Sequence, residues 1–230
     1  GFASQCRAMT ALTDAVKDEI QTAYRTWLAA RDFKPRRGQR QMIAQIARSL
    51  SADEDRISVV EAATGAGKTA AYCLAAIPLA QSLNKTIVLS TATVALQEQV
   101  ILQDLPDIQE RAGLKFSLTL AKGRGRYLCL KRLDDHLKYT DQQEIPIFDA
   151  TDEDHTVLYQ EMLNRFSQGQ WDGEVDSWAE GMSDGAWSGV TTDHRGCSKN
   201  RCSFFKQCPF FRARSHLEGS DVIVANHDLV

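Results

Sequence analysis

The sequence predicts an α/β fold in which a parallel sheet is interrupted by an irregular inserted module. Strand and helix patterns alternate with short links from about residue 11 to Ala121. The alternation then stops for about ninety residues that are rich in Gly, Trp and acidic side chains. An apolar strand pattern resumes at Asp221-Val222-Ile223-Val224-Ala225. An insertion into an α/β domain accounts best for this order, and we find no internal repeat.

The first sixty residues predict two helices and a strand. Apolar side chains recur at helical spacing over roughly 11–30, and a second apolar face follows the link at Phe33-Lys34-Pro35. A polar turn at 51–56 leads to a strand at 57–60. The apolar positions are Leu12, Val16, Ile20, Tyr24, Trp27 and Leu28 in the first helix, Met42, Ile43, Ile46 and Leu50 in the second, and Ile57, Val59 and Val60 in the strand.

The next sixty residues continue the alternation. We expect a helix from Ala70 to about Ile77, ending near Pro78, because proline disfavours a helix interior. A buried-type strand follows at 86–90, then a helix through Leu96 and Gln99, and a third strand at 116–120. This pattern predicts a parallel sheet with helical crossovers.

A phosphate-binding loop lies between the first strand and the third helix, at Ala62-Ala63-Thr64-Gly65-Ala66-Gly67-Lys68-Thr69. Gly65 and Gly67 let the backbone N–H groups approach phosphates closely, and the helix N-terminus adds a favourable dipole. Lys68 is expected to contact the β- and γ-phosphates, and the Thr69 hydroxyl is expected to ligate Mg²⁺. Ala62 replaces the usual first glycine. The motif therefore predicts binding of ATP or a close relative.

Four cysteines predict a metal centre in the inserted module. Cys129 stands alone, and Cys197, Cys202 and Cys208 follow as C-x4-C-x5-C, with Pro after the last. Four thiolates hold either zinc or an iron–sulfur cluster. The wide spacing and the terminal Cys-Pro favour a [4Fe–4S] cluster, since zinc knuckles usually pair as C-x2-C. Disulfides are the other alternative, and a cytoplasmic chain disfavours them.

The remaining cysteines and the tryptophans have plainer interpretations. Cys73 is expected in the core, on the helix after the loop, and Cys6 falls in residues 1–8, which we interpret as a leader outside the fold. Trp171, Trp178 and Trp187 of the insert are interpreted as a small core, with a partner surface as the alternative.

Charge is distributed unevenly around a net value of −3. Residues 141–185 hold twelve Asp or Glu and one Arg, whereas residues 195–214 hold six Lys or Arg and no acid. A second basic group, Lys122, Arg124 and Arg126, precedes Cys129. Local cationic surfaces of this kind suit a polyanion, although solvated faces are the plain alternative. No apolar run is long enough to span a membrane and no signal pattern is present, so we expect a cytoplasmic protein with no membrane partner.

One tempting motif is interpreted as accidental. Asp152-Glu153-Asp154-His155 matches the D-E-x-H box that ligates Mg²⁺ and positions water in helicases. A working box follows a buried strand, whereas this one follows Asp149-Ala150-Thr151 within the acidic segment. We find no other D-E-x-H candidate in the sequence.

Taken together, the motifs resemble the DinG-type helicases of the XPD-like iron–sulfur branch of superfamily 2. The similarity runs from about Met9 to Val230. It includes the phosphate loop as motif I, Ser90-Thr91-Ala92-Thr93-Val94-Ala95-Leu96-Gln97 as motif Ia, and Val224-Ala225-Asn226-His227 as the return to the motor. The element Arg36-Arg37-Gly38-Gln39 resembles the upstream R-x-x-Q, and Lys122-Gly123-Arg124-Gly125-Arg126 resembles the entry to the cluster domain.

The resemblance implies specific roles and a domain order. Arg36 and Gln39 would join the nucleotide site, with Gln39 at the adenine edge. Thr91, Thr93, Gln97, Arg124 and Arg126 would contact DNA, and the four cysteines Cys129, Cys197, Cys202 and Cys208 would hold the cluster. The expected order is the first part of a RecA-like motor domain at 9–121, an iron–sulfur domain at 122–213, and a return to the motor at 214–230.

The resemblance further implies a monomeric 5′ to 3′ DNA helicase that acts on single-stranded DNA and on forked or hybrid duplexes in repair or replication. Family members continue past this stretch, so we expect the stretch alone to bind ATP without hydrolysing it. The alternatives are a P-loop ATPase that handles iron–sulfur clusters and a zinc-stabilised nucleic-acid-binding module.

Overall fold

The computed structural model describes residues 12–54, 56–142 and 155–229. The chain divides into two compact units, one formed by Gly1–Ala121 with Gly219–Val230 and the other by Lys122–Glu218. The residues predicted as a leader, and residues 152–154 of the D-E-x-H match, lie outside the described residues. No helix among the described residues is long and apolar enough to cross a bilayer.

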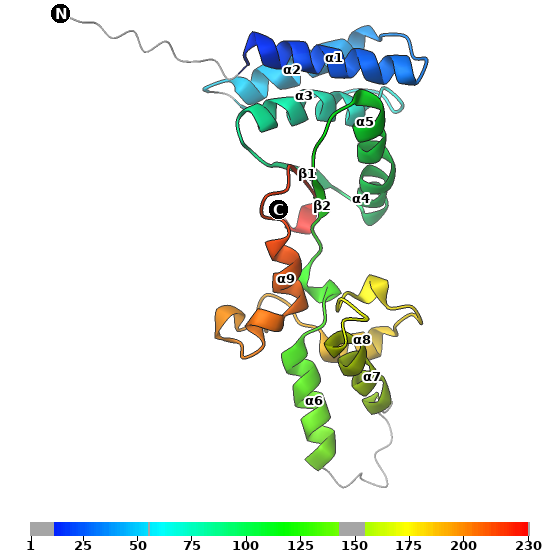
Figure 1. The fold of residues 1–230 in the computed structure, drawn as a ribbon, viewed down its shortest axis with the longest axis vertical. Helices are drawn as coiled ribbons and strands as arrows, with labels where there is room; N and C mark the ends of the chain where they lie inside the picture. Colours follow the sequence, from blue (N-terminus) through cyan, green and yellow to red (C-terminus); the bar gives the residue numbers. More distant parts are fainter. Residues whose placement is uncertain (1–11, 55, 143–154, 230) are drawn as a thin grey trace, which may run out of the picture. The chain divides into compact units, whose positions relative to one another are not determined.

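Helices make up most of the first unit, and one of them is central (Figure 1). Helix α3 (Lys68–Ser82) lies beneath α1 (Asp14–Ala30) and α2 (Arg37–Ser51) and also packs against α5 (Leu105–Ala112). Helix α4 (Val94–Gln99) runs through a π-helical turn, η1 (Val100–Asp104), into α5.

The sheet of the first unit has three parallel strands in the order β1–β3–β2. Strand β3 (Val222–Asn226) lies between β1 (Ile87–Thr91) and β2 (Leu118–Leu120), although it is the last in the chain. The register pairs Val222 with both Ile87 and Leu118. The three strand predictions and the parallel pairing are confirmed, and the sheet is of the partial RecA-like kind.

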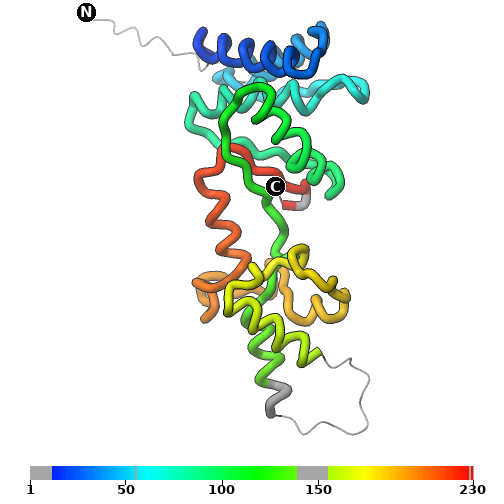
Figure 2. Tube along the Cα trace, turned by 45° about the vertical axis from the view of Figure 1, so that its right-hand side comes forward, coloured from blue at the N-terminus to red at the C-terminus, as the bar shows by residue number. Residues whose placement is uncertain are grey.

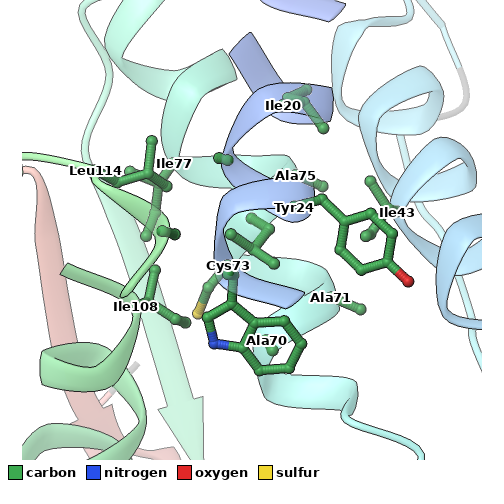
Figure 3. Close-up of a cluster of buried hydrophobic side chains, with 14 of the residues drawn as sticks. Ile20, Tyr24, Ile43, Ala70, Ala71, Cys73, Ala75, Ile77, Ile108 and Leu114 are labelled. Atoms are coloured by element: carbon green, nitrogen blue, oxygen red, sulfur yellow. The ribbon is translucent and has the colours of Figure 1, made fainter. Parts of the chain in front are cut away.

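A single apolar cluster holds the first unit together (Figure 3). The small residues Ala71, Cys73 and Ala75 of α3 let the neighbouring helices approach closely, and all three are at most 1% exposed. Cys73 is thus a core residue, as predicted. The other labelled members come from α1, α2, α5 and the segment after α5: Ile20, Tyr24, Ile43, Ile108 and Leu114.

Two elements of the first unit differ from the sequence predictions. Residues 57–60 do not form a strand, and Ile57 and Val59 are 87% and 93% exposed. No strand of the described residues pairs with this segment, and an extended segment becomes a strand only through a neighbour's hydrogen bonds. Helix α3 does not end near Pro78 but continues to Ser82. Burial of Ile77 and Leu79 on either side offsets the hydrogen bond that proline removes.

Helices and short 3₁₀ turns form the second unit around its own core. Helices α6 (Leu130–Gln142) and α7 (Thr156–Ser167) lie side by side (Figure 2), and α8 (Asp184–Val190) packs on α6. A further helix, α9 (Pro209–Ser215), begins directly after Cys208. The core contains all three tryptophans of the insert together with Leu128, Leu133, Met162 and Val190. The interpretation of the tryptophans as a small core is therefore confirmed.

Candidate nucleotide and cysteine sites

The phosphate loop is shaped by two glycines in the left-handed conformation. Gly65 and Gly67 each have φ of +74°, where only glycine is free of strain. Gly67 is also the N-cap of α3, so the loop delivers its backbone to a helix N-terminus. The Lys68 ammonium donates to the Ala62 carbonyl at 2.8 Å and to the Ala63 carbonyl at 3.3 Å, across the loop.

Arg36 and Gln39, at the start of α2, brace the loop from the opposite side. The Arg36 guanidinium donates to the Gly65 carbonyl at 3.0 Å, and the Gln39 amide donates to the Gly67 carbonyl at 3.3 Å. The Gln39 oxygen in turn accepts from the Tyr24 hydroxyl at 3.1 Å. Gln39 is 5% exposed, so in this structure its amide faces the loop backbone. Adenine recognition by Gln39 stays a prediction.

A cavity of about 560 Å³ opens in front of the loop and is large enough for a small ligand. Lys68 and Thr69 line it together with Arg36 and Gln39, so the structure brings the predicted nucleotide residues to one place. Its other walls come from the end of α1, the segment that follows it, and η1 with the start of α5.

Sequence reasoning missed an aromatic and cationic rim on this cavity. The Arg31 guanidinium lies 5.3 Å from the ring centroids of both Trp27 and Phe33, and Phe33 is 48% exposed. Asp107 of α5 fixes this rim, because it accepts from the Trp27 indole N–H at 2.8 Å and pairs with Arg31 at 3.3 Å. A basic side chain followed closely by an aromatic one, just before R-x-x-Q, was the available signal. The arrangement presents an exposed ring face beside a fixed cation.

Sequence reasoning also missed Asp104, which ends the π-helical turn and lines the same cavity. Burial raises the pKa of its carboxyl, while hydrogen bonding from Thr69 and Gln99 lowers it. Its Oδ2 atom is buried and has no hydrogen-bond partner among the described residues. No sequence motif marks this aspartate, because only the fold brings it beside Thr69.

The four predicted cysteines lie around one small cavity of the second unit. Cys129, Cys197, Cys202 and Cys208 all line a space of about 30 Å³ that is otherwise walled largely by apolar side chains. All four are free thiols of intermediate exposure. Within the described residues, no group of three or more His, Cys, Asp or Glu side chains forms a site for a metal ion. The thiols thus share a cavity without forming a closed ion site.

Local turns position these cysteines. Cys129 precedes α6, and its N–H donates to the Val190 carbonyl at 2.7 Å. Cys208 is the N-cap of α9, with Pro209 at the first helical position. Burial raises the pKa of the Cys208 thiol, backbone hydrogen bonds from Phe211 and Phe210 lower it, and the neighbouring Cys129 and Cys197 raise it.

The Arg124 side chain, predicted to contact DNA, belongs to the surroundings of this cavity. Its guanidinium donates to the Cys197 sulfur at 2.9 Å and lies 3.9 Å from the centroid of the Phe210 ring. The backbone N–H of Lys199 also donates to the Cys197 sulfur, at 3.3 Å. Donors of this kind stabilise the thiolate form of a cysteine.

The other predicted DNA contacts have varied placements. Thr93 is exposed and caps α4, accepting from the Leu96 N–H at 3.2 Å, and the half-buried Thr91 hydroxyl donates to the Thr93 carbonyl at 3.2 Å. Gln97 is 6% exposed and donates to the Ala121 carbonyl at 3.4 Å. The placement of Gln97 gives no support to a DNA contact by that side chain.

The first basic group is neutralised within the second unit. Lys122 pairs with Glu174 and with Asp176, and Arg126 also pairs with Asp176. The basic stretch at 195–214 is different, since five of its cations are exposed and no acid falls within it. These five are Arg195, Lys199, Arg201, Lys206 and Arg212.

Comparison with known proteins decides the family. The family model described as "DEAD/DEAH box helicase" matches residues 36–162, which is 127 of the 230 residues and includes the whole phosphate loop. The chain belongs to the DEAD/DEAH box helicase family. Within this family, the braced loop and its cavity occupy the place of the nucleotide site.

Individual relatives narrow the likeness further. The chain is 38% identical over 224 residues to "ATP-dependent DNA helicase DinG" of Photobacterium profundum, and 38% identical over 229 residues to the proteins of the same name in Escherichia coli K12 and Salmonella typhimurium. These matches cover 95% or 96% of this chain but only 32% of each relative. The chain therefore spans about a third of the length of these relatives.

Proposed function

We propose that this chain is the nucleotide-binding portion of a DinG-type, ATP-dependent DNA helicase. The observation that carries the proposal is the phosphate loop, with two left-handed glycines, at the N-terminus of α3 and facing a cavity of about 560 Å³. A loop with this conformation directs N–H groups at phosphates. The names of the relatives add ATP and DNA as the expected ligands.

In this proposal each residue of the loop has a physical role. The N–H groups of residues 63–69 cradle the phosphates, and Lys68 supplies a point charge to the β- and γ-phosphates. Arg36 and Gln39 hold the loop in the binding conformation through the Gly65 and Gly67 carbonyls. The Thr69 hydroxyl is the side chain that would ligate Mg²⁺, which bridges phosphate oxygens and offsets their charge when it is bound.

Hydrolysis and unwinding belong to the longer protein. Phosphoryl transfer needs carboxylates that position the metal and water, and an arginine that stabilises the transition state. We propose that the relatives' remaining two thirds include these groups, so that this stretch binds ATP and the whole protein translocates 5′ to 3′ as a monomer. The proposed setting is cytoplasmic DNA repair or replication.

We further propose that the second unit holds a [4Fe–4S] cluster on Cys129, Cys197, Cys202 and Cys208. The chemistry of the cavity supports this, because all four thiols face one space walled by Phe and Leu side chains. A guanidinium and a backbone N–H donate to the Cys197 sulfur, as sulfur ligands of clusters require. A bound cluster would tie four distant chain segments together, which makes its role one of folding.

For DNA, we propose that the exposed cations of 195–214 form the main phosphate contacts of the second unit, with Thr91 and Thr93 contacting the strand on the first. Arg124 and Arg126 have internal partners and would contribute less. Binding through phosphates is strongly salt-dependent.

Nucleotide binding is tested by calorimetric titration of the chain with ADP in the presence of Mg²⁺. Lys68→Ala is expected to reduce affinity at least tenfold, because it removes a charge at the phosphates, whereas the exposed Lys85→Ala is the matched control and should bind like the parent. In the longer protein, Lys68→Ala should abolish DNA-stimulated ATP hydrolysis. Near-normal affinity and turnover in Lys68→Ala would sink the proposal.

The cluster is tested by the visible spectrum and the metal content of anaerobically purified protein. The expected result is a brown protein with broad visible absorption and close to four irons per chain, all lost in Cys202→Ser. A colourless protein with one zinc would instead favour the zinc-stabilised module. DNA-stimulated hydrolysis separates a motor from an ATPase that handles clusters.

A further inference from the structure

A carboxylate outside the phosphate loop shares the nucleotide cavity. Asp104 lies at the end of the π-helical turn Val100–Asp104, between α4 and α5. It lines the 560 Å³ cavity together with Lys68, Thr69 and Gln99. A π-helical turn inside a longer helix costs hydrogen-bond geometry, and such turns are found frequently at functional sites. Here the turn directs an acidic side chain towards the N-terminus of α3.

The Asp104 carboxyl is incompletely satisfied. Thr69 and Gln99 provide hydrogen bonding to it, yet Oδ2 is buried and has no partner among the described residues. Buried polar atoms in proteins nearly always have a hydrogen-bond partner, and a carboxylate oxygen without one is costly. An oxygen of this kind, at the wall of a ligand cavity, has a partner that arrives with the ligand.

The Thr69 hydroxyl connects Asp104 to the phosphate site. A hydroxyl has one proton to donate and two lone pairs that accept. Its side chain faces both the Asp104 carboxyl and the Tyr72 hydroxyl. The carboxylate is the stronger acceptor, so it takes the Thr69 proton and fixes the orientation of the hydroxyl. That orientation leaves an oxygen lone pair of Thr69 for a cation.

We propose that Asp104 is a positioning residue of the nucleotide site, which orients the Thr69 hydroxyl for Mg²⁺ and offers its free Oδ2 to the water shell of the ion. The inference rests on the proposed function, since it requires that the cavity take a magnesium nucleotide. Magnesium in proteins usually keeps several waters and takes few protein ligands, so acceptors for those waters matter. Loss of such an outer partner typically weakens metal binding 10- to 100-fold.

The test compares ADP affinity of the 230-residue chain in Mg²⁺ and in EDTA, by calorimetry. The ratio of the two affinities measures what Mg²⁺ contributes. In Asp104→Asn this ratio should fall about tenfold or more, with the EDTA affinity unchanged within about twofold. Glu98→Gln, an exposed neutralisation on α4, is the matched control and should leave both affinities unchanged.

A double variant tests whether Asp104 acts through Thr69. Thr69→Val removes the hydroxyl and should itself lower the ratio. Adding Asp104→Asn to Thr69→Val should lower it little further, because residues that act as one unit are not additive. Asp104→Ala is the second single variant, in case an amide at this buried position prevents folding, and far-ultraviolet circular dichroism checks each protein.

The outcomes separate the two proposals. If the parent chain does not bind ADP in Mg²⁺, the proposed function fails. If the parent binds and Asp104→Asn keeps the parent's ratio, or loses affinity equally in Mg²⁺ and EDTA, the role of Asp104 is overturned. A ratio that falls additively in the double variant overturns action through Thr69.

Discussion

Replacing Gly67 by alanine tests how the phosphate loop is held. Gly65 and Gly67 have the same φ of +74°, so either alanine variant places a side chain in the left-handed region, at a cost of about 1–2 kcal/mol. Their surroundings differ. A Cβ at Gly65 meets nothing within 4 Å, whereas a Cβ at Gly67 comes within 2.4 Å of the Gln39 amide nitrogen.

The extra cost at Gly67 follows from the hydrogen bonds of Gln39. Its side chain is flexible, so the clash is relieved by moving the amide, but it then loses its bonds to the Gly67 carbonyl and the Tyr24 hydroxyl. Each bond contributes about 1 kcal/mol. Gly67→Ala should therefore destabilise the first unit by about 2–4 kcal/mol, which exceeds the effect of Gly65→Ala by about 1–2 kcal/mol.

The assay is hydrogen exchange, followed by mass spectrometry, in the slowest-exchanging amides of α3 without nucleotide. Every 1.4 kcal/mol of lost stability speeds exchange about tenfold, so the two variants should differ by roughly 5- to 30-fold. In a Gln39→Ala background the difference should disappear. Equal exchange in Gly65→Ala and Gly67→Ala, or a difference that persists without the Gln39 amide, would refute the reasoning.

Three further predictions concern packing and ionisation. Leu74→Ala should cost about 2–5 kcal/mol of unfolding free energy, since Leu74 is 0% exposed; denaturant titration checks this against Leu102→Ala, at a 71% exposed position, which should stay within about 0.5 kcal/mol. Cys73 should resist iodoacetamide at pH 8 in the native chain and react in denaturant, because burial raises the pKa of its thiol; mass spectrometry of native-labelled peptides that showed modified Cys73 would contradict this. Hydrogen bonding from the Ser117 N–H and hydroxyl lowers the pKa of Asp221. Its stabilising effect is present above its unfolded pKa of about 3.9 and is lost as pH falls through the lower folded value, so Asp221→Asn should be less stable near neutral pH and have a weaker acid dependence below about pH 4, which thermal melts across pH 2–6 would measure.

Local patterns were sufficient for elements whose neighbours are close in sequence. The amphipathic spacing of α1 and α2 fixes which face is buried, and the apolar runs at 87–91 and 222–226 identify strands. The phosphate loop is equally local, because its strained conformation depends on glycines at two fixed positions. The tryptophan core of the insert follows from composition, since large apolar side chains must find cover.

Long-range neighbours were beyond the reach of local patterns. The segment 57–60 has a strand's composition but no partner in the described residues, and α3 passes Pro78 because its burial outweighs a lost hydrogen bond. Likewise the basic residues near Cys129 resemble a DNA-binding surface until their internal partners are seen. Arg124 meets a cysteine 73 positions away, a contact that no spacing rule encodes.

The sequence by itself determined that this protein has a nucleotide loop, a parallel sheet and four spaced cysteines, because each depends on residues a few positions apart. Tertiary structure alone decided the order of the sheet and the wall of the nucleotide cavity. Strand β3 enters between β1 and β2 from more than a hundred residues away, and the π-helical turn brings Asp104 to Thr69. Such juxtapositions follow from packing of whole elements, in which the burial of many apolar side chains fixes where a few polar ones meet.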